Sequence, residues 1–126
     1  TDTVYLSQQD IRQFQLAKAA ISAGIETLLI ECGVDKMQVE KLYIAGGLGY
    51  FMNVANAAKT GLLPLALSHK AKAVGNSSLS GARICLLNEQ AQKNIEDIAS
   101  ETQIVELSFS KTFQDLYVEN MYFEEL

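Results

Sequence analysis

The sequence contains few of the residues from which disulfide frameworks and metal centres are built. Its 126 residues include two cysteines, one histidine, one proline and no tryptophan. Cys32 and Cys85 lie far apart in apolar patterns and neither belongs to a CxxC pair. We therefore expect two buried thiols and no zinc or iron–sulfur site in this chain. His69 has no Cys, Asp or Glu at ligand spacing, and we interpret it as a solvated loop residue.

Charge and hydropathy argue against nucleic acids and membranes as partners. The formal net charge is −5, and the 10 basic residues form no run. Because phosphate backbones and anionic lipids are bound by clustered Lys and Arg, we expect neither kind of surface. No apolar stretch approaches the length needed to cross a bilayer, and no signal peptide opens the chain, so we expect a cytoplasmic protein.

What the sequence does contain is the composition of one folded domain. Apolar residues make up 48% and charged residues 20%, which is typical of a globular protein. The chain begins at Thr1 without an initiator Met and already in structured sequence. We therefore interpret residues 1–126 as a single lobe of a longer protein.

A long amphipathic helix is predicted near the N-terminus. Ser7 is its expected N-cap, with Asp10 in a role like that of a capping box, and Gly33 is expected to end it. Gly24 inside it predicts close packing against another element. The spacing predicts a buried apolar stripe made of Ile11, Phe14, Ala17, Ile21, Ile25, Leu28, Leu29 and Cys32.

Strands and helices are predicted to alternate along the rest of the chain. Strands are expected at 3–6, 41–45, 71–76 and 103–107, and helices at 53–59, 77–88, 89–101 and 110–123. The strand at 41–45 shows little polar alternation, which is typical of a strand buried on both faces. Ala91, Ile95, Ile98 and Ala99 are expected to face inward. This alternation predicts an α/β domain.

Two places share the pattern of a strand, a glycine and then a helix start: "YIAGGLGYFMN" and "AVGNSSLSGA". Ligands of open α/β sheets bind at the carboxyl ends of strands, so two adjacent turns of this kind would form a groove lined by backbone. The dinucleotide, P-loop and nucleophile-elbow motifs are all absent. From glycine alone, a structural turn and a ligand-binding turn are equally supported.

Three stretches in this order resemble the C-terminal domain of the reductive activators of corrinoid proteins: "QDIRQFQLAKAAISAGIETLL", "LYIAGGLGYFMNVANAAKTGLLP" and "VGNSSLSGARICLL". These activators are iron–sulfur ATPases of the acetate and sugar kinase, Hsc70 and actin superfamily. The resemblance implies a ribonuclease-H-like, actin-like ATPase lobe with a mixed sheet flanked by helices. It also implies a cytoplasmic protein that uses ATP to reduce a Co(II) corrinoid protein of a methyltransferase system to Co(I).

The resemblance also implies a set of nucleotide-binding residues. Three glycines match the adenosine motif, in which backbone passes against adenine and ribose, and three polar side chains share one face of the first helix. The last residue follows the second glycine turn. The set consists of Gly46, Gly47, Gly49, Gln15, Lys18, Ser22 and Asn76. A solvated helix charge remains the alternative for Lys18, and a purely turn-forming role for Asn76.

The departures from the family pattern limit what this lobe does alone. The phosphate loops that hold Mg²⁺ and the cysteines of a [2Fe–2S] domain would lie upstream, so we expect negligible ATPase activity from residues 1–126. The alternative is an interaction or dimerisation module of the same fold without nucleotide binding. The aromatic-rich "FQDLYVENMYF" favours that alternative, unless its rings form a core face.

Overall fold

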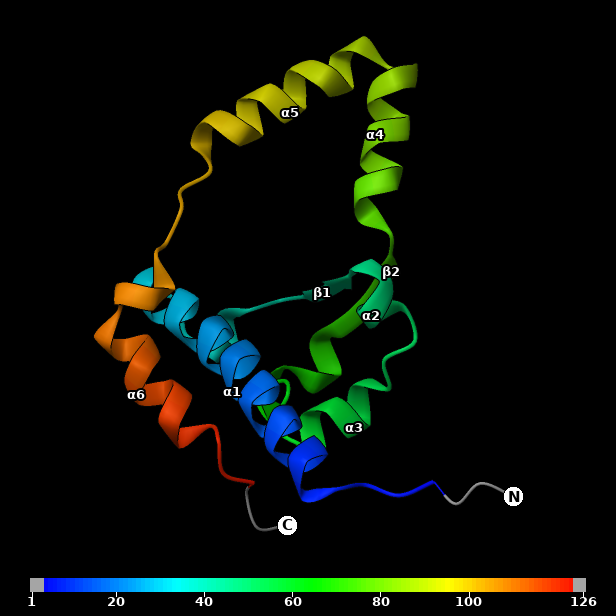
Figure 1. Ribbon diagram of the computed structural model, residues 1–126. Coiled ribbons are helices and arrows are strands. Elements are labelled where there is room, and N and C mark those ends of the chain that lie inside the picture. The colour runs from blue at the N-terminus through cyan, green and yellow to red at the C-terminus, as the bar shows by residue number, and fades with distance from the viewer. Residues whose placement is uncertain (1–3, 124–126) are drawn as a thin grey trace.

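The computed structural model describes residues 4–123, except for the side chain of Leu48. Three short 3₁₀ turns connect or precede the regular elements, at Lys36–Gln38, Leu65–Lys70 and Leu107–Phe109. The helices and strands, labelled in Figure 1, are α1 (Gln8–Glu31), β1 (Leu42–Ala45), α2 (Gly46–Tyr50), α3 (Val54–Lys59), β2 (Ala71–Gly75), α4 (Ser77–Leu87), α5 (Glu89–Glu101) and α6 (Lys111–Glu119). Among these residues, no helix is long and apolar enough to cross a membrane.

The caps of α1 form as predicted from the sequence. Ser7 and Asp10 make a complete capping box, in which the Asp10 amide donates to Ser7 Oγ and the Ser7 amide donates to the Asp10 carboxylate. At the other end Gly33 adopts a φ of 63°. Its amide donates to the carbonyl of Ile30, and that of Val34 donates to Leu29, which is a Schellman ending.

The sheet formed by the described residues consists of β1 and β2 alone, paired in parallel. The pairing runs from Leu42 opposite Ala71 to Ala45 opposite Gly75. No other strand of the expected mixed sheet is formed within residues 4–123. The strand predicted at 103–107 is wrong, because that stretch is irregular and leads into a 3₁₀ turn. The strand predicted at 3–6 is wrong for residues 4–6, and Thr3 lies outside the described residues.

The core lies between α1, α3 and α6, and it is built from small residues. α1 packs along α6, and Gly24 of α1 lies against Leu107, where an added Cβ would stand 3.6 Å from the Leu107 side chain. The buried apolar residues among those described are Ala19, Ala23, Ala57, Ala58, Leu63 and Leu67. Gly24 therefore packs against another element, as predicted, although an added Cβ would make only an ordinary van der Waals contact there.

The predicted apolar stripe of α1 is not the buried face. Phe14, Ile21 and Leu28, spaced seven residues apart, are each about two-fifths exposed, and Cys32 is exposed. The face that is buried instead carries polar and small side chains, including Ser22 and Thr27. The spacing of the apolar residues shows that they share one face of α1. The described elements, however, pack against the neighbouring face of that helix. The prediction of two buried thiols is wrong, because Cys32 is exposed and Cys85 is only partly buried.

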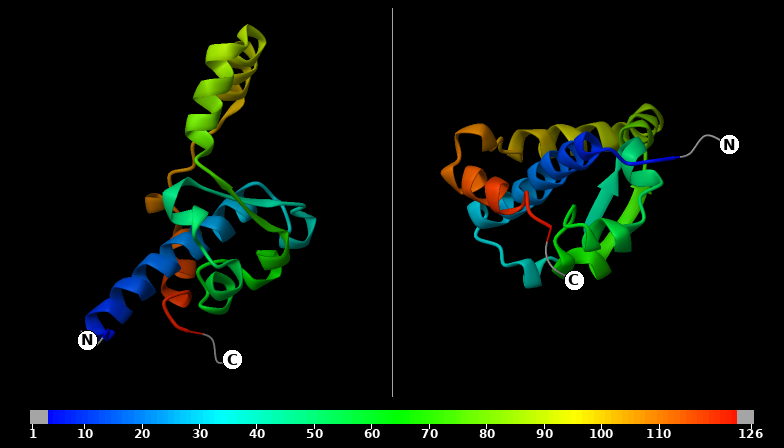
Figure 2. Two further views of the ribbon diagram at one scale, coloured as in Figure 1. Left: turned by 90° about the vertical axis from the view of Figure 1, so that its right-hand side faces the viewer. Right: turned by 60° about the horizontal axis from the view of Figure 1, so that its bottom comes forward.

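α4 and α5 form an arm that projects from the rest of the molecule. Figure 1 shows the two helices beyond the β1–β2 sheet, and Figure 2 shows the arm standing away from α1, α3 and α6 in a second view. The inward positions predicted for Ile95 and Ile98 are wrong, because both side chains are largely exposed. Tyr43 of β1 is more than half exposed, so β1 is not buried on both faces by the described residues.

Candidate functional site

Both strands end in a glycine with a left-handed backbone at the same edge of the sheet. Gly46 follows β1 with a φ of 84°, and Gly75 closes β2 with a φ of 68°. The two turns lie side by side because Ala45 is paired with Gly75 in a parallel register. An L-residue adopts this conformation only with strain, so each glycine allows its strand to turn sharply into the following helix. The adjacency on which the backbone-lined groove depends is therefore present.

The three glycines of the first turn have different environments. A Cβ added to Gly46 or Gly47 would meet no heavy atom within 4 Å. A Cβ added to Gly49 would collide with the Ile44 side chain and stand 3.3 Å from the Ile44 carbonyl carbon. Gly49 is therefore required for α2 to pack on β1. Gly47 has no such requirement, since its φ is not left-handed and the space beside it is open among the described residues.

The second turn is closed by a cap. Asn76 Oδ1 accepts a hydrogen bond of 3.0 Å from the amide of Leu79, and the Ser80 hydroxyl donates to the Asn76 carbonyl at 3.1 Å. These contacts make Asn76 the N-cap of α4. The structure therefore provides the turn-forming role that the sequence left open for this residue.

An aromatic pair beside the glycine turns was missed by the sequence reasoning. The Tyr50 ring lies against Gly75, with ring carbons 3.5 and 3.7 Å from the position of an added Cβ. It meets Phe51 edge to face, with ring centroids 4.8 Å apart. Tyr50 is 63% exposed and Phe51 is 88% exposed. The sequence carried a signal for this surface, because Tyr50 and Phe51 directly follow the glycine motif.

The polar face of α1 binds the C-terminal segment. Gln15 Nε2 donates to the carbonyl of Met121 at 3.1 Å, and Lys18 Nζ donates to that of Tyr122 at 2.6 Å. Lys18 Nζ also lies 5.0 Å from the centre of the Phe123 ring. Lys18 is only 2% exposed, so the alternative of a solvated helix charge is wrong.

The contacts observed for these side chains are with the C-terminal segment and with the end of α3. Ser22 is buried beside the end of α3, where Lys18 also contacts Gly61. The structure thus brings Gly46, Gly47, Gly49 and Asn76 together at the sheet edge. It places Gln15, Lys18 and Ser22 in a separate cluster between α1, α3 and the C-terminal segment.

A shallow groove lies between α1 and the segment that follows α2. Its volume is about 410 Å³, and it is lined mainly by apolar groups with a few amide and hydroxyl groups. The lining residues are Phe14, Phe51, Met52, Asn53, Asn56, Ala57, Thr60 and Leu62. Phe51 belongs to both the aromatic pair and this groove, so the groove begins where the glycine turn ends.

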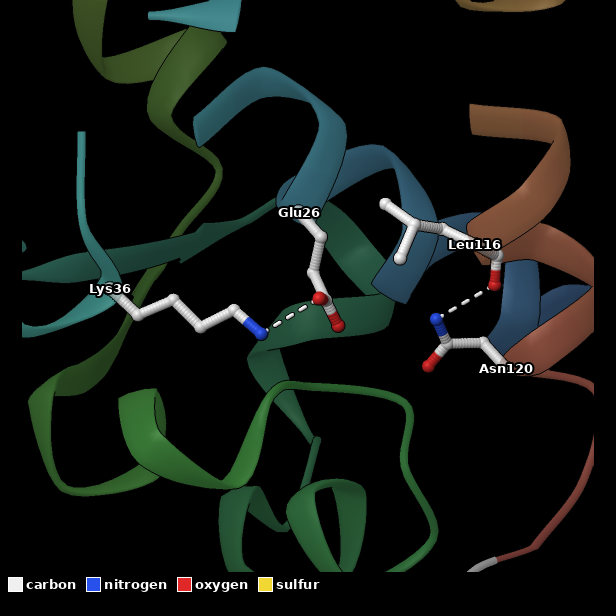
Figure 3. Close-up of polar contacts among 4 residues, drawn as sticks. All are labelled: Glu26, Lys36, Leu116 and Asn120. Atoms are coloured by element: carbon white, nitrogen blue, oxygen red, sulfur yellow. Dashed lines mark hydrogen bonds and ion pairs between the residues drawn. The ribbon is translucent and has the colours of Figure 1, made fainter. Parts of the chain in front are cut away.

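The polar contacts shown in Figure 3 stabilise the ends of helices. An ion pair joins Lys36 Nζ to Glu26 Oε2 at 2.7 Å and ties the turn after α1 back to that helix. In the same view Asn120 Nδ2 donates to the Leu116 carbonyl at 2.9 Å and closes α6. Hydrogen bonds from Ser7 lower the pKa of Asp10, at the start of α1. Within residues 4–123, no three His, Cys, Asp or Glu side chains are grouped to hold a metal ion.

These features define an α/β domain with a glycine-lined edge at the carboxyl ends of two parallel strands. Residues 1–126 match the family described as "C-terminal domain of RACo the ASKHA domain", and the chain belongs to this family. The family resemblance drawn from the three sequence stretches is thereby confirmed. The family assignment also confirms the actin-like α/β fold class.

Named relatives share this domain as a small part of a longer chain. The "Corrinoid activation enzyme RamQ" of Eubacterium limosum is 32% identical over 120 residues, which is 95% of this chain and 20% of that protein. The "[Co(II) methylated amine-specific corrinoid protein] reductase" of Methanosarcina barkeri is 26% identical over 117 residues, or 91% of this chain and 22% of that one.

A solved structure shows the same arrangement. The "Reductive activator for corrinoid,iron-sulfur protein" is 37% identical, with a TM-score of 0.83, over 94% of this chain and 19% of its own. The chain therefore spans about a fifth of the length of the relatives it matches.

Proposed function

We propose that this chain is the adenosine-side lobe of an ATP-dependent reductive activator, which returns Co(II) corrinoid proteins to Co(I) for methyl transfer. The names of the similar proteins support the corrinoid protein as partner. The observation that carries the role of the lobe is the open backbone at Gly46 and Gly47, beside the second glycine turn at Gly75. ATP would supply the free energy for an unfavourable reduction.

The residues of the glycine edge fit a flat heterocycle. The backbone of Gly46 and Gly47 has no Cβ and no neighbouring side chain among the described residues, so a ring can approach it closely. The exposed Tyr50 ring stands beside it over Gly75 and offers a wall for stacking. In this proposal the backbone positions the base, and Tyr50 limits its lateral movement.

The remaining parts of the reaction belong to other domains in this proposal. Cys32 and Cys85 are both free thiols, on different helices or their ends, and they do not fit a [2Fe–2S] cluster. The residues that hold Mg²⁺ and phosphate are likewise assigned to upstream sequence. Gln15, Lys18 and Ser22 stay a prediction as nucleotide-binding residues, and their observed contacts support a role in holding α3 and the C-terminal segment against α1.

Hydrogen–deuterium exchange of the complete gene product tests this function. With a non-hydrolysable ATP analogue, we expect peptides covering 46–50 and 75–80 to exchange more slowly, while peptides from α6 remain unchanged. Protection confined to other regions would show that the glycine edge serves chain geometry alone. Protection of residues 113–123 on addition of the corrinoid protein, without nucleotide, would instead favour the interaction module.

A further inference from the structure

We propose that a small polar cavity between α1 and the loop after α3 is a binding site for a small zwitterionic amino acid, such as glycine or alanine. The cavity has a volume of about 130 Å³. Its wall is formed by α1, the turn at Lys36–Gln38, residues 58–66 and the end of α6. These lining residues differ from those of the glycine edge, so the proposal does not depend on ATP or on corrinoid.

The first observation is a buried hydroxyl whose hydrogen-bonding capacity is not used. Ser22 of α1 is only 2% exposed, and it lines the cavity. Among the described residues its hydroxyl has no hydrogen-bond partner. Because buried polar groups are almost always paired and an unpaired one lowers stability, Ser22 indicates that a polar partner enters the cavity.

The second observation is that both signs of charge face the same cavity. Glu26 lies one helical turn after Ser22, and its Oε2 accepts a hydrogen bond of 2.7 Å from Lys36 Nζ. A carboxylate has a second oxygen and an ammonium has two further N–H groups, so both members of the pair can also bind a ligand. The Glu26 side chain is 19% exposed, so an ionic contact to it is only partly screened by water.

Asn120 supplies a further acceptor to the same cavity. Its Nδ2 donates to the Leu116 carbonyl, which fixes the amide and leaves Oδ1 as an acceptor. Figure 3 shows the Glu26 carboxylate between the Lys36 ammonium and the Asn120 amide. The cavity thus offers three side-chain oxygens, from Ser22, Glu26 and Asn120, to an ammonium group that has three N–H donors.

The charge and the size of the cavity determine the class of ligand. Glu26 and Lys36 neutralise each other, so a ligand with a net charge would leave one charge uncompensated in a partly buried site. A zwitterion, with its ammonium toward Glu26 and its carboxylate toward Lys36, leaves none. The volume is that of roughly four water molecules, which limits the ligand to a few non-hydrogen atoms. The wall at Ala58, Leu63 and Pro64 is apolar and suits a hydrogen or methyl side chain.

Equilibrium dialysis of the complete gene product against radiolabelled glycine tests the proposal, with neither nucleotide nor corrinoid protein present. We expect saturable binding of one glycine per chain, with a Kd of about 0.1–1 mM for so small a ligand. Unlabelled L-alanine should compete. Glycinamide lacks the carboxylate and N-acetylglycine lacks the ammonium, so each should compete about 10-fold more weakly because it loses one charge-assisted contact.

Two substitutions assign the binding to this cavity. We expect Ser22→Ala to raise the Kd for glycine about 5-fold and Glu26→Gln to raise it about 10-fold, because each removes a hydrogen-bonding group from the wall. Thr27→Val is the matched control. Thr27 has a buried hydroxyl without a partner among the described residues, on the same helix, but it does not line the cavity. Its Kd should equal that of the wild type, and thermal unfolding checks that each variant is folded.

Four outcomes would overturn the proposal. The absence of saturable binding would mean that water alone fills the cavity, and an unchanged Kd in both cavity variants would place glycine elsewhere. Equal competition by L-alanine and N-acetylglycine would exclude recognition of a zwitterion. Competitive displacement of glycine by a non-hydrolysable ATP analogue would assign the cavity to the nucleotide site. Because the first measurements contain no nucleotide, failure to bind glycine leaves the proposed ATP site untouched, and failure of that site leaves this result valid.

Discussion

The substitution Gly47→Ala separates the two possible reasons for glycine at the sheet edge. Gly47 lies within α2, has no left-handed φ, and has open space where a Cβ would stand. Replacing a helical glycine by alanine stabilises a helix by about 1 kcal/mol. In a protein of this size or larger, that gain raises Tm by roughly 2–4 °C. If glycine served only the fold, alanine would therefore be an improvement.

A bound adenine ring changes the expectation for the same methyl group. A methyl forced into a close contact costs about 1–3 kcal/mol, which corresponds to a roughly 5- to 150-fold weaker Kd. We therefore expect Gly47→Ala to raise Tm and to weaken ATP binding in the complete protein. Thermal unfolding and titration calorimetry measure the two effects on one sample. A variant that is more stable and binds ATP as tightly as the wild type would refute the proposed site.

Gly49→Ala is the matched control. Its Cβ would collide with Ile44, so we expect a loss of about 1–3 kcal/mol of stability from overpacking between α2 and β1. The two substitutions add the same methyl group to the same helix, two residues apart. Opposite shifts of Tm support the observed packing of α2, whereas a loss of stability in both would show that other polypeptide fills the space at Gly47.

The remaining predictions concern the aromatic wall, the C-terminal segment and the helix cap. Tyr50→Ala is expected to weaken ATP binding several-fold while Tyr50→Phe retains it, because stacking needs the ring alone; equal affinities would remove Tyr50 from the site. Lys18→Met is expected to release the C-terminal segment, seen as faster amide exchange and proteolysis near Tyr122; unchanged exchange would show that the other contacts suffice. Ser7→Ala is expected to lower the free energy of unfolding by about 1 kcal/mol, measured by urea denaturation. The pKa of Asp10 is lowered in the folded state, so its stabilisation is present above the unfolded-state pKa and is lost as pH falls through the folded-state pKa; Asp10→Asn should remove that acid dependence.

The local features of this fold could be predicted because short-range chemistry determines them. Ser7 was predicted as the N-cap of α1, and its side chain accepts the expected amide hydrogen bond. Asn53 lies at the start of the helix predicted at 53–59 and caps α3 in the same way. Gly33 and Gly61 end their helices with left-handed φ values, as glycine does. The sequence indicated that two such turns would form a backbone-lined groove if they were adjacent, and the parallel pairing of β1 with β2 makes them adjacent.

The contacts that were not predicted join distant parts of the chain. The assignment of Lys18 to a nucleotide face stays a prediction, but its hydrogen bond to the carbonyl of Tyr122, 104 residues away, was not foreseen. Nothing in the local pattern of α1 indicates that contact. The apolar row at Phe14, Ile21 and Leu28 was predicted to be buried, yet the described elements leave it half open. A hydrophobic pattern indicates which face of a helix is suited to burial. It does not identify the element that covers this face.

The rigidity of the β1–β2 sheet bears directly on the glycine edge, where the nucleotide site is proposed. α2, which begins with the two open glycines and ends with Tyr50, has its main contacts with β1 and β2. The position of the two open glycines therefore depends on the rigidity of a two-stranded sheet. If only a fraction of the lobe population has an ordered edge, the apparent affinity falls by that fraction. We therefore expect substitutions that loosen the pairing of β1 with β2 to weaken nucleotide binding at the proposed site.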